Sequence, residues 1–296
     1  MQRGVLTAVA ARAAAVVLFS AVLTTVLLAP AAQSRTNRPS ASAVHGARNA
    51  SMRTQRPLRL LQFNIMDGAT EGRAAAVAAV IRASQADVVT LDEVNDEVAF
   101  KQIAAATGFR SRLVDAADGF NVAILSRFPI RQCRGYRQPP VRHAAYGCQI
   151  RVGSVDWWIF GAHLYPFDES VRATEIRFII GQMKKRLPGP VVLAGDLNTD
   201  TPGETNGMGT LVVPLLRAAG YVDAFRELHS WQQDHGFTAD TPAYGSWEQR
   251  VDYVFHSRAA RPVAARVISS HDGTPWPSDH AALFVVLALR PAPAKR

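Results

Sequence analysis

The sequence has only 2 cysteines among its 296 residues, too few for a small domain built on disulfides. Long apolar runs are equally scarce, because only residues 13–30 form an uncharged stretch that could cross a bilayer. A polytopic membrane protein is therefore excluded. Hydrophobic residues still make up 48% of the chain, which excludes a disordered chain and a collagen-like repeat. The length fits one large α/β domain or two small ones.

Acidic residues are missing from the first part of the chain, where the earliest is Asp67. Of the 33 basic residues, 7 precede Leu58, which leaves 26 basic against 24 acidic residues from Leu58 onward. The formal net charge of +9 thus rests mostly on the N-terminal segment. Whole-chain charge is consequently weak evidence for nucleic-acid binding.

The N-terminal segment reads as targeting sequence followed by linker. Arg3 and Arg12 precede the apolar run, and small residues at 29–32 offer a signal-peptidase site. Residues 1–32 are expected to be a cleaved signal peptide, or an uncleaved anchor with its arginines inside. The protein is therefore expected to be secreted, or membrane-anchored and facing the extracellular side. Residues 33–57 lack hydrophobic periodicity and predict a disordered basic linker, and residues 291–296 predict a C-terminal tail.

Cys133 and Cys148 lie close together in the sequence. In an exported protein they are expected to form one disulfide. Closing a loop of about 15 residues would stabilise the fold by roughly 3 kcal/mol. The alternative is a reduced, buried pair.

From Leu58 onward the chain alternates short apolar runs with longer amphipathic ones, which predicts an α/β fold with sheets packed on sheets and helices outside. Strands are predicted at residues 58–64, 87–94, 121–126, 148–152, 156–163, 191–196, 251–256, 263–269 and 281–289. Helices are predicted at residues 71–84, 96–107, 170–187 and 211–219.

Polar side chains gather at the ends of these strands. Asn64, Glu93, His163, Asp196 and Asn198 lie where a strand stops, Asp252 lies near the start of a strand, and Asp279 and His280 precede the last strand. Strand ends on one side of an α/β sheet form a natural crevice. Carboxylate and amide oxygens suit a hard divalent cation such as Mg²⁺ or Mn²⁺, and histidines can bind phosphate or move a proton. The set predicts metal-assisted attack of water on phosphorus.

Seven segments carry a family resemblance: FNI, DEV, NVAILSRFP, GAHL, AGDLNT, RVDYVF and SDHAA, in this order. Together they resemble the endonuclease/exonuclease/phosphatase superfamily over roughly residues 58–290. The resemblance implies a four-layer α/β sandwich, two packed mixed β-sheets flanked by helices. It also implies that Glu93 is the principal metal ligand, with Asn64 and Asp279 beside it.

The resemblance further implies catalytic roles. Asp196 would activate the water and Asn198 would help to hold the phosphate. His280 would contact the scissile phosphate, with its tautomer fixed by Asp252, and His163 would be a second phosphate donor or the leaving-group acid.

Two further residues are expected to bind substrate: Asn121, which would touch the phosphate, and Arg127. The sequence also departs from the family pattern twice. Asp92 stands where a glutamine is usual, so it adds negative charge near the metal or faces the other side of its strand. No carboxylate is obvious beside Asn121 to orient His163.

The tryptophans, a group of arginines and the remaining histidines can each be structural or functional. Trp157 and Trp158 are expected in the core, whereas Trp231, Trp247 and Trp276 lie in predicted loops and could stack on a base or enter lipid. The arginines between Arg127 and Arg142 form either a solvated basic face or a phosphate-tracking surface. The remaining histidines, including His143, are expected at the surface or behind the site.

The sequence thus predicts an exported, monomeric phosphoesterase dependent on Mg²⁺ or Mn²⁺. The leading hypothesis is a nuclease whose substrate is DNA or RNA. The alternatives are a phosphoesterase for phospholipid head groups or small phosphorylated molecules such as inositol phosphates, and a degenerate member that only binds. Activity that falls steeply with salt would favour the nuclease.

Overall fold

The computed structural model describes residues 55–204, 209–239, 249–270 and 275–291. The predicted targeting segment, residues 33–54 of the predicted linker, most of the predicted C-terminal tail and Trp247 lie outside these ranges. Within them, none of the helices has the length and apolar character needed to cross a membrane.

The described chain forms twelve strands, four α-helices and one short 3₁₀ turn. One set of strands comprises β1 (Leu58–Asn64), β2 (Val88–Asp92), β3 (Arg110–Val114), β4 (Val122–Ser126), β11 (Ala260–Ile268) and β12 (Ala282–Leu289). The other comprises β5 (Ile130–Tyr136), β6 (Ala144–Val152), β7 (Val155–His163), β8 (Val191–Asp196), β9 (Val222–Asp223) and β10 (Asp252–His256). The helical elements are η1 (Asp67–Ala69), α2 (Ala74–Ser84), α3 (Glu97–Thr107), α4 (Glu169–Lys184) and α5 (Val212–Ala218).

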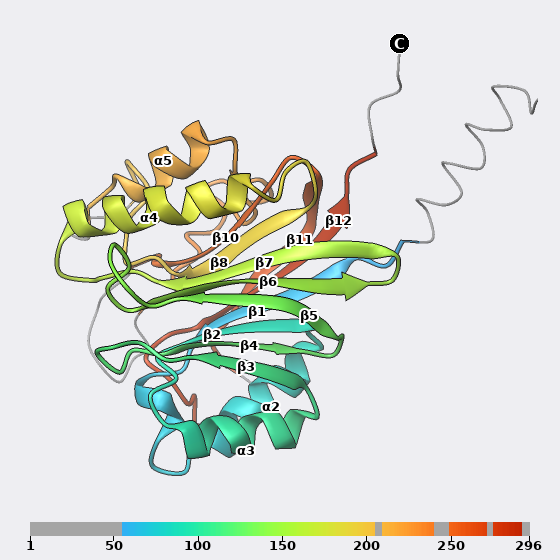
Figure 1. Cartoon of the computed structure of the whole chain (residues 1–296), viewed down its shortest axis with the longest axis vertical. Coiled ribbons are helices and arrows are strands. Elements are labelled where there is room, and N and C mark those ends of the chain that lie inside the picture. Colours follow the sequence, from blue (N-terminus) through green and yellow to red (C-terminus); the bar gives the residue numbers. More distant parts are fainter. Residues whose placement is uncertain (1–54, 205–208, 240–248, 271–274, 292–296) are drawn as a thin grey trace, which may run out of the picture. The chain divides into compact units, whose positions relative to one another are not determined.

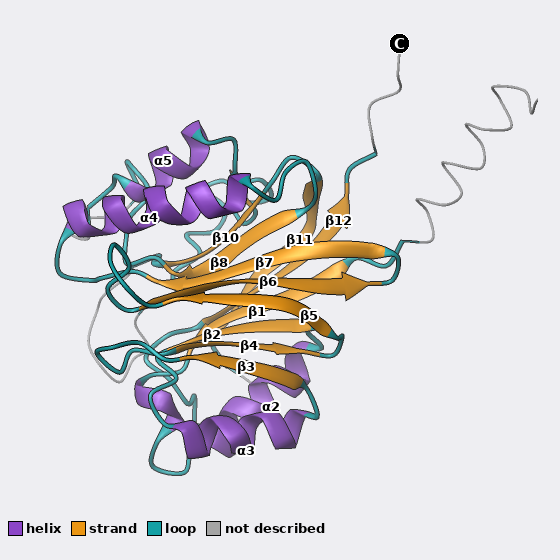
Figure 2. Ribbon diagram, viewed as in Figure 1, coloured by secondary structure: helices purple, strands orange, loops and turns teal. Residues whose placement is uncertain are grey.

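These strands make two six-stranded sheets that pack face to face (Figure 1). Their strand orders are β11-β12-β1-β2-β4-β3 and β5-β6-β7-β8-β10-β9. Helices α2 and α3 cover the outer face of the first sheet, and α4 and α5 cover that of the second (Figure 2). The predicted four-layer α/β sandwich is confirmed.

Apolar side chains hold the layers together. Leu60, Val285, Tyr146, Trp157 and Ile159 belong to one buried cluster between the two sheets. Each sheet has a further buried cluster between its outer face and the helices that cover it. Burial of this surface, at roughly 25 cal/mol per Å², is the main force that presses the sheets together.

Each sheet has one parallel pair of strands at its centre, and the remaining named pairs are antiparallel. Strand β1 reaches β2 through α2, and β7 reaches β8 through α4. Ligand sites commonly form where the carboxyl ends of parallel strands open. The chain places two such openings together, because β1 and β8 end in Asn64 and Asp196, whose side chains are hydrogen-bonded.

Aspartate caps fix two helices next to this edge. Asp96 accepts hydrogen bonds from the backbone N–H groups of Val98 and Ala99 at the start of α3. Asp168 does the same for Ser170 and Val171 at the start of α4. Such caps each stabilise a helix by about 1 kcal/mol, so both helices begin at a defined residue beside the strand ends.

The sequence pattern missed three strands, β3, β5 and β9. Strands β3 and β5 are edge strands with the sequences RSRLV and IRQCRGY, and most of their residues are at least partly exposed. Without a buried face on each second residue they lack the apolar alternation by which strands are recognised. Strand β9 has only 2 residues. Helix α2 begins at Ala74 rather than residue 71, because residues 70–73 form a turn.

The two cysteines are bonded to each other. Cys133 on β5 lies opposite Cys148 on β6 in the register of the pair. The predicted disulfide is confirmed, and it joins an edge strand to its buried neighbour.

Candidate active site

Strand register collects acidic and amide side chains at one edge of the two sheets. Parallel pairing of β1 with β2 sets Asn64 opposite Asp92, and antiparallel pairing of β8 with β10 sets Asp196 opposite Asp252. Gly195 allows this arrangement, because a Cβ at that position would collide with the carbonyl oxygen of Ala162 on β7. The residues predicted to act together are therefore supplied by four strands of both sheets.

Asp196 is the point on which the other groups converge. Its Oδ2 accepts a hydrogen bond from Asn64 Nδ2 at 3.1 Å. The Nε2 atoms of His163 and His280 lie 3.7 and 3.8 Å from the same oxygen. Its Oδ1 accepts a hydrogen bond from the backbone N–H of Asn198 at 2.9 Å. The carboxylate is thus buried, oriented and flanked by two imidazoles.

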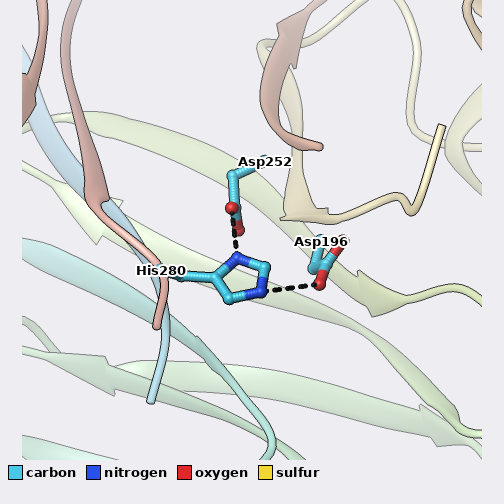
Figure 3. A group of neighbouring side chains, drawn as sticks. All are labelled: Asp196, Asp252 and His280. Atoms are coloured by element: carbon cyan, nitrogen blue, oxygen red, sulfur yellow. Dashed lines mark hydrogen bonds and ion pairs between the residues drawn. The ribbon is translucent and has the colours of Figure 1, made fainter. Parts of the chain in front are cut away.

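His280 is held by a second carboxylate (Figure 3). Its Nδ1 lies 2.8 Å from Asp252 Oδ2, so the opposite nitrogen faces Asp196. The amide of Gln62 donates to Asp252 Oδ1 at 3.1 Å. Trp276 Nε1 donates to the carbonyl oxygen of His280 at 2.7 Å. These contacts set the ring orientation that the resemblance implied for His280 and Asp252.

The electrostatics of Asp196 and His280 follow from burial and from their neighbours. For His280, burial lowers the pKa, but Asp252 outweighs it through charge and a hydrogen bond, and the pKa rises to about 10. For Asp196, burial and the charge of Asp252 raise the pKa to about 7, against the opposing influence of His280. At neutral pH His280 is therefore a cation, and it lies beside the carboxyl group of Asp196, which is only partly ionised.

Asp92 lies beneath Asp196 rather than on the far side of its strand. Its Oδ2 accepts hydrogen bonds from the backbone N–H of Asp196 at 2.7 Å and from Gln62 Nε2 at 2.6 Å. Burial, and then the charge of Asp196, raises the pKa of Asp92 well above its ordinary value. This departure from the family pattern therefore adds a carboxyl group to the floor of the site.

Glu93 lies beside Asn64, as predicted for two ligands of one metal. Asn64 Nδ2 donates to Glu93 Oε1 at 3.0 Å, and the backbone N–H of Asp67 donates to Oε2 at 3.1 Å.

Glu93 has a φ of 56°, in the left-handed region that costs an ordinary residue roughly 1–2 kcal/mol. Asn198 is left-handed too, with a φ of 46°. Strain of this kind tends to cluster at functional sites.

Asp279 and Asn198 take their places through neighbouring groups. Ser278 Oγ donates to the carbonyl oxygen of Asn64 at 2.7 Å and lies 3.4 Å from Asp279 Oδ1. Asp279 is thus near β1, but its observed partner is Ser278 rather than Glu93. Asn198 Nδ2 donates to the carbonyl oxygen of Leu164 at 2.9 Å, which ties the end of β8 to the end of β7.

The two predicted substrate-binding residues are placed differently. Asn121 has its side chain engaged with backbone, accepting from the N–H of Ala116 at 2.7 Å and donating to the carbonyl oxygen of Val94 at 3.1 Å. Arg127 lies at the opposite end of β2, where its Nε donates to the carbonyl oxygen of Ala86 at 2.9 Å. The structure brings Asn121 next to the residue after Glu93, but it does not bring Arg127 to the site.

A second histidine lies against His163. The rings of His143 and His163 have centroids 4.7 Å apart, tilted by 33°. His143 Nδ1 lies 2.7 Å from Asp118 Oδ2. In the part of the chain that the structure describes, His163 Nδ1 and His143 Nε2 are buried and have no hydrogen-bond partner. Burial and the two neighbouring imidazoles, His143 and His280, lower the pKa of His163 well below its ordinary value.

The sequence pattern places His143 at the surface or behind the site and gives no signal at Asp118. His143 directly precedes Ala144, which lies opposite His163 in the pairing of β6 with β7. Strand register would therefore have revealed the contact, but the predicted strand began only at Cys148. Asp118 lies in a turn with no regular pattern, so no signal pointed to it.

A family model described as the Endonuclease/Exonuclease/phosphatase family matches residues 61–280. The chain belongs to this family. Its members are hydrolytic phosphoesterases that depend on divalent metals, and the protein is an enzyme of this class. A search of curated proteins found no significant match.

Solved structures share the fold at low identity. A humanized TDP2 from D. rerio is 19% identical with a TM-score of 0.64, covering 78% of this chain and 98% of its own. A mannosyl-6-phosphatase from Bacteroides thetaiotaomicron is 17% identical with a TM-score of 0.64, covering 78% and 99%. The human Nocturnin catalytic domain is 18% identical with a TM-score of 0.61, covering 79% and 94%.

The donor set fits the divalent metal of the family. Ligand atoms of Asp196, Asp252 and His280 lie within 4.8 Å of one another. Protonated His280 has no lone pair to offer, however, and it already binds Asp252. Asn64 and Glu93 supply oxygens next to the same carboxylate, which suits a hard cation. The concentration of carboxyl groups at this edge, with raised pKa values for Asp92 and Asp196, also favours added positive charge.

We expect protons and the metal ion to compete for the carboxyl groups of the site, so metal binding should depend on pH. The pKa values of Asp196 and His280 lie above their ordinary values of 3.8 and 6.5. The folded, metal-free enzyme therefore binds more protons than the unfolded chain, through Asp196 between about pH 4 and 7 and through His280 up to about pH 10. The stability that these two groups contribute should therefore fall as the pH rises through that window, whereas the lowered pKa of His163 acts in the opposite sense only below its ordinary value of 6.5. The increase in Tm produced by Mg²⁺ or Mn²⁺ should be larger at pH 8 than at pH 6.

Two variants separate the possible ligand sets in the same thermal measurement. Glu93→Gln should lose most of the metal-induced increase in Tm, whereas His280→Gln should retain it. A larger increase at pH 6 than at pH 8, or a metal response that depends on His280 and not on Glu93, would contradict this assignment.

We also expect His143 to support turnover by packing against His163. His143→Ala should lower kcat by about 10-fold or more with little change in KM, because His163 would lose the ring that fixes its position. His143→Phe keeps a flat ring and should recover most of kcat. Wild-type kcat in His143→Ala would show that the contact has no role in turnover.

Proposed function

We propose that the protein is an exported nuclease that hydrolyses phosphodiester bonds in DNA or RNA with Mg²⁺ or Mn²⁺. The observation that carries the proposal is the position of Asp196 Oδ2, which lies 3.7 Å from the Nε2 of His163 and 3.8 Å from that of His280. A carboxylate between two imidazoles can hold an attacking water while the imidazoles hold the oxygens of a phosphate.

In this scheme Asp196 is the general base. Its Oδ2 accepts a proton from water as the water oxygen bonds to phosphorus and the bond from phosphorus to the leaving oxygen breaks. The backbone N–H of Asn198 orients the carboxylate through Oδ1. A protonated carboxyl group cannot accept the proton of the water, so Asp196 functions as the base in its ionised form.

The two histidines have different roles because their charges differ. His280 is protonated, so it attracts the phosphate and can supply the proton that the leaving oxygen needs; Asp252 holds its ring from the other side. His163 is neutral at ordinary pH because its pKa is lowered. It is suited to donate a hydrogen bond to a phosphate oxygen rather than to act as the acid.

Glu93 and Asn64 would hold the metal, with the charge of Asp196 close by. When bound, the cation supplies Lewis-acid polarisation of the phosphate and stabilises its developing charge. Asp279 remains a predicted ligand. Mg²⁺ and Mn²⁺ both suit this oxygen-rich set.

Nucleic acid is favoured as substrate by the surroundings of the site. Arg142, which is exposed, places its guanidinium 5.4 Å from the ring centre of Tyr165, and the ring of Tyr165 lies 5.6 Å from that of His143. Combined aromatic and cationic surfaces are typical of single-stranded nucleic-acid binding. A structure of D. rerio TDP2, 17% identical to this chain, holds a single-strand DNA product.

The second candidate is a phosphoesterase for phospholipid head groups or small phosphorylated molecules. It is favoured by the nearly balanced charge of the chain after Leu58. Within the arginine cluster, Arg131 and Arg137 lie 3.8 Å from carboxylates of Asp156 and Asp115, which reduces their attraction for a nucleic-acid backbone. A mannosyl-6-phosphatase is among the structures with this fold.

Export is proposed from the sequence of residues 1–32, as a cleaved signal peptide or a retained anchor. The disulfide between Cys133 and Cys148 supports it, because such bonds persist in oxidising compartments. A monomer is proposed as the working unit.

Substrate assays test the proposed function. We expect the enzyme with Mg²⁺ to cleave supercoiled DNA or RNA, with activity abolished by EDTA and restored by added Mg²⁺. Cleavage should fall steeply between about 50 and 200 mM salt, as phosphate contacts release counterions. Sphingomyelin vesicles and inositol phosphates serve as the comparison substrates. Turnover of either without cleavage of any nucleic acid would contradict the nuclease, and activity unaffected by EDTA would remove the metal from the reaction.

A further inference from the structure

A continuous series of aromatic rings leads from His163 to the protein surface. The ring of His143 packs on His163, with centroids 4.7 Å apart, and Tyr165 lies 5.6 Å from His143. Phe167 follows at 5.5 Å from Tyr165, at an interplanar angle of 77°. Phe120 flanks the start of the series, 4.7 Å from His143 and 5.8 Å from His163. The four outer members, Phe120, His143, Tyr165 and Phe167, are called the ring series below.

Exposure increases along the ring series. His143 is buried, Phe120 and Tyr165 are half-buried, and Phe167 has 84% of its surface exposed. A phenylalanine just before a helix cap commonly packs against the fourth helical residue. Here that residue is Arg172, which is buried and donates to the carbonyl oxygens of Tyr165 and Pro166. Phe167 is left facing water, so the fold itself gains little from its ring.

Helix α4 fixes the backbone of the segment that carries this exposed ring. Glu175 on α4 accepts the backbone N–H groups of Arg142 and Tyr165, at 2.7 and 3.0 Å. Asp168 caps the helix directly after Phe167. The segment between His163 and α4 is thus fastened at both ends. A rigid aromatic surface binds a flat ligand at low cost in conformational entropy.

Arg142 gives the ring series its charge. Its guanidinium carbon lies 5.4 Å from the ring centre of Tyr165. Among the residues that the structure describes this guanidinium makes no ion pair, although its charge partly offsets the raised pKa of Glu175. A guanidinium over an aromatic ring, next to an exposed phenylalanine, can bind a phosphate and the base attached to it. Lipid insertion calls instead for a broader apolar surface than one exposed phenylalanine.

We propose that Tyr165 and Phe167, with Arg142 beside them, form a stacking subsite for a nucleobase next to the scissile phosphate. This subsite rests on the proposed nuclease activity and defines its substrate as single-stranded or locally unpaired nucleic acid, because a paired and stacked base cannot present its face to the ring series. Stacking is sequence-tolerant, since every base has a flat face. The subsite therefore selects a base over its absence rather than one base over another.

The test compares two oligonucleotides with the full-chain enzyme and Mg²⁺. In each oligonucleotide a single phosphodiester linkage can be cleaved, because all the other linkages are methylphosphonates. The first oligonucleotide carries a base on every nucleotide. The second has an abasic nucleotide on each side of the cleavable phosphodiester. We expect wild-type kcat/KM to be about 5- to 100-fold higher on the substrate with bases. Phe167→Ala should remove much of this preference by lowering kcat/KM on that substrate alone.

Three control variants make the result specific. Phe167→Trp should keep the preference, because it keeps a flat ring, whereas Phe167→Leu should lose it although it stays apolar. Val263→Ala removes an exposed apolar side chain on edge strand β11 and should leave both rates at the wild-type values. Since Phe167 is exposed, none of its variants should lower Tm appreciably.

The outcomes separate the subsite from the proposed function. If both oligonucleotides are cleaved with the same kcat/KM, or if Phe167→Ala leaves the preference intact, the subsite is overturned and the nuclease stands. If neither oligonucleotide is cleaved while sphingomyelin vesicles are hydrolysed and Phe167→Ala slows that reaction, both proposals fail and the ring series is a lipid contact. Loss of preference in Phe167→Ala and Phe167→Leu, with retention in Phe167→Trp, supports the subsite.

Discussion

The structure depends on keeping several carboxyl groups buried close to one another. Asp92, Asp196 and Asp252 approach through the backbone and amide contacts that join them, and water cannot screen their repulsion. Part of the cost is offset by the proton on His280, which Asp252 stabilises. The remainder appears as raised pKa values for Asp92 and Asp196. A site with such raised pKa values favours a divalent cation, because the positive charge stabilises the ionised form of carboxyl groups that water cannot reach.

The fold brings these groups together through two similar halves. Each sheet contributes one parallel strand pair, and the ends of β1, β2, β7 and β8 meet at a single edge. Side chains placed on strand ends are fixed by the sheets, and helix caps at Asp96 and Asp168 fix the segments that leave them. Left-handed backbone at Glu93 and Asn198 adds local strain that the surrounding hydrogen bonds sustain. The positions of the side chains in the site therefore depend on both β-sheets.

Much of the fold and the central part of the site were predictable from sequence, because apolar strands that stop at a carboxylate leave a clear pattern. Asp196, Asp252 and His280 were placed together by their motifs, and the structure brings them together. Strands β3 and β5 escaped prediction because edge strands need no buried face. His143 escaped because its contact with His163 depends on the pairing of β6 with β7. Arg127 lies in a motif that reaches the far end of β2, a distance that sequence order does not reveal.

The turnover of Asp196→Asn shows whether Asp196 is the base that takes the proton of the attacking water. The substitution keeps the size of the side chain and removes its charge and its ability to take a proton. We expect kcat on the cleaved substrate, with Mg²⁺ at pH 8, to fall by about 10²- to 10⁴-fold, while the thermal transition shows that the variant stays folded. A folded Asp196→Asn enzyme with kcat within a few-fold of wild type would contradict it.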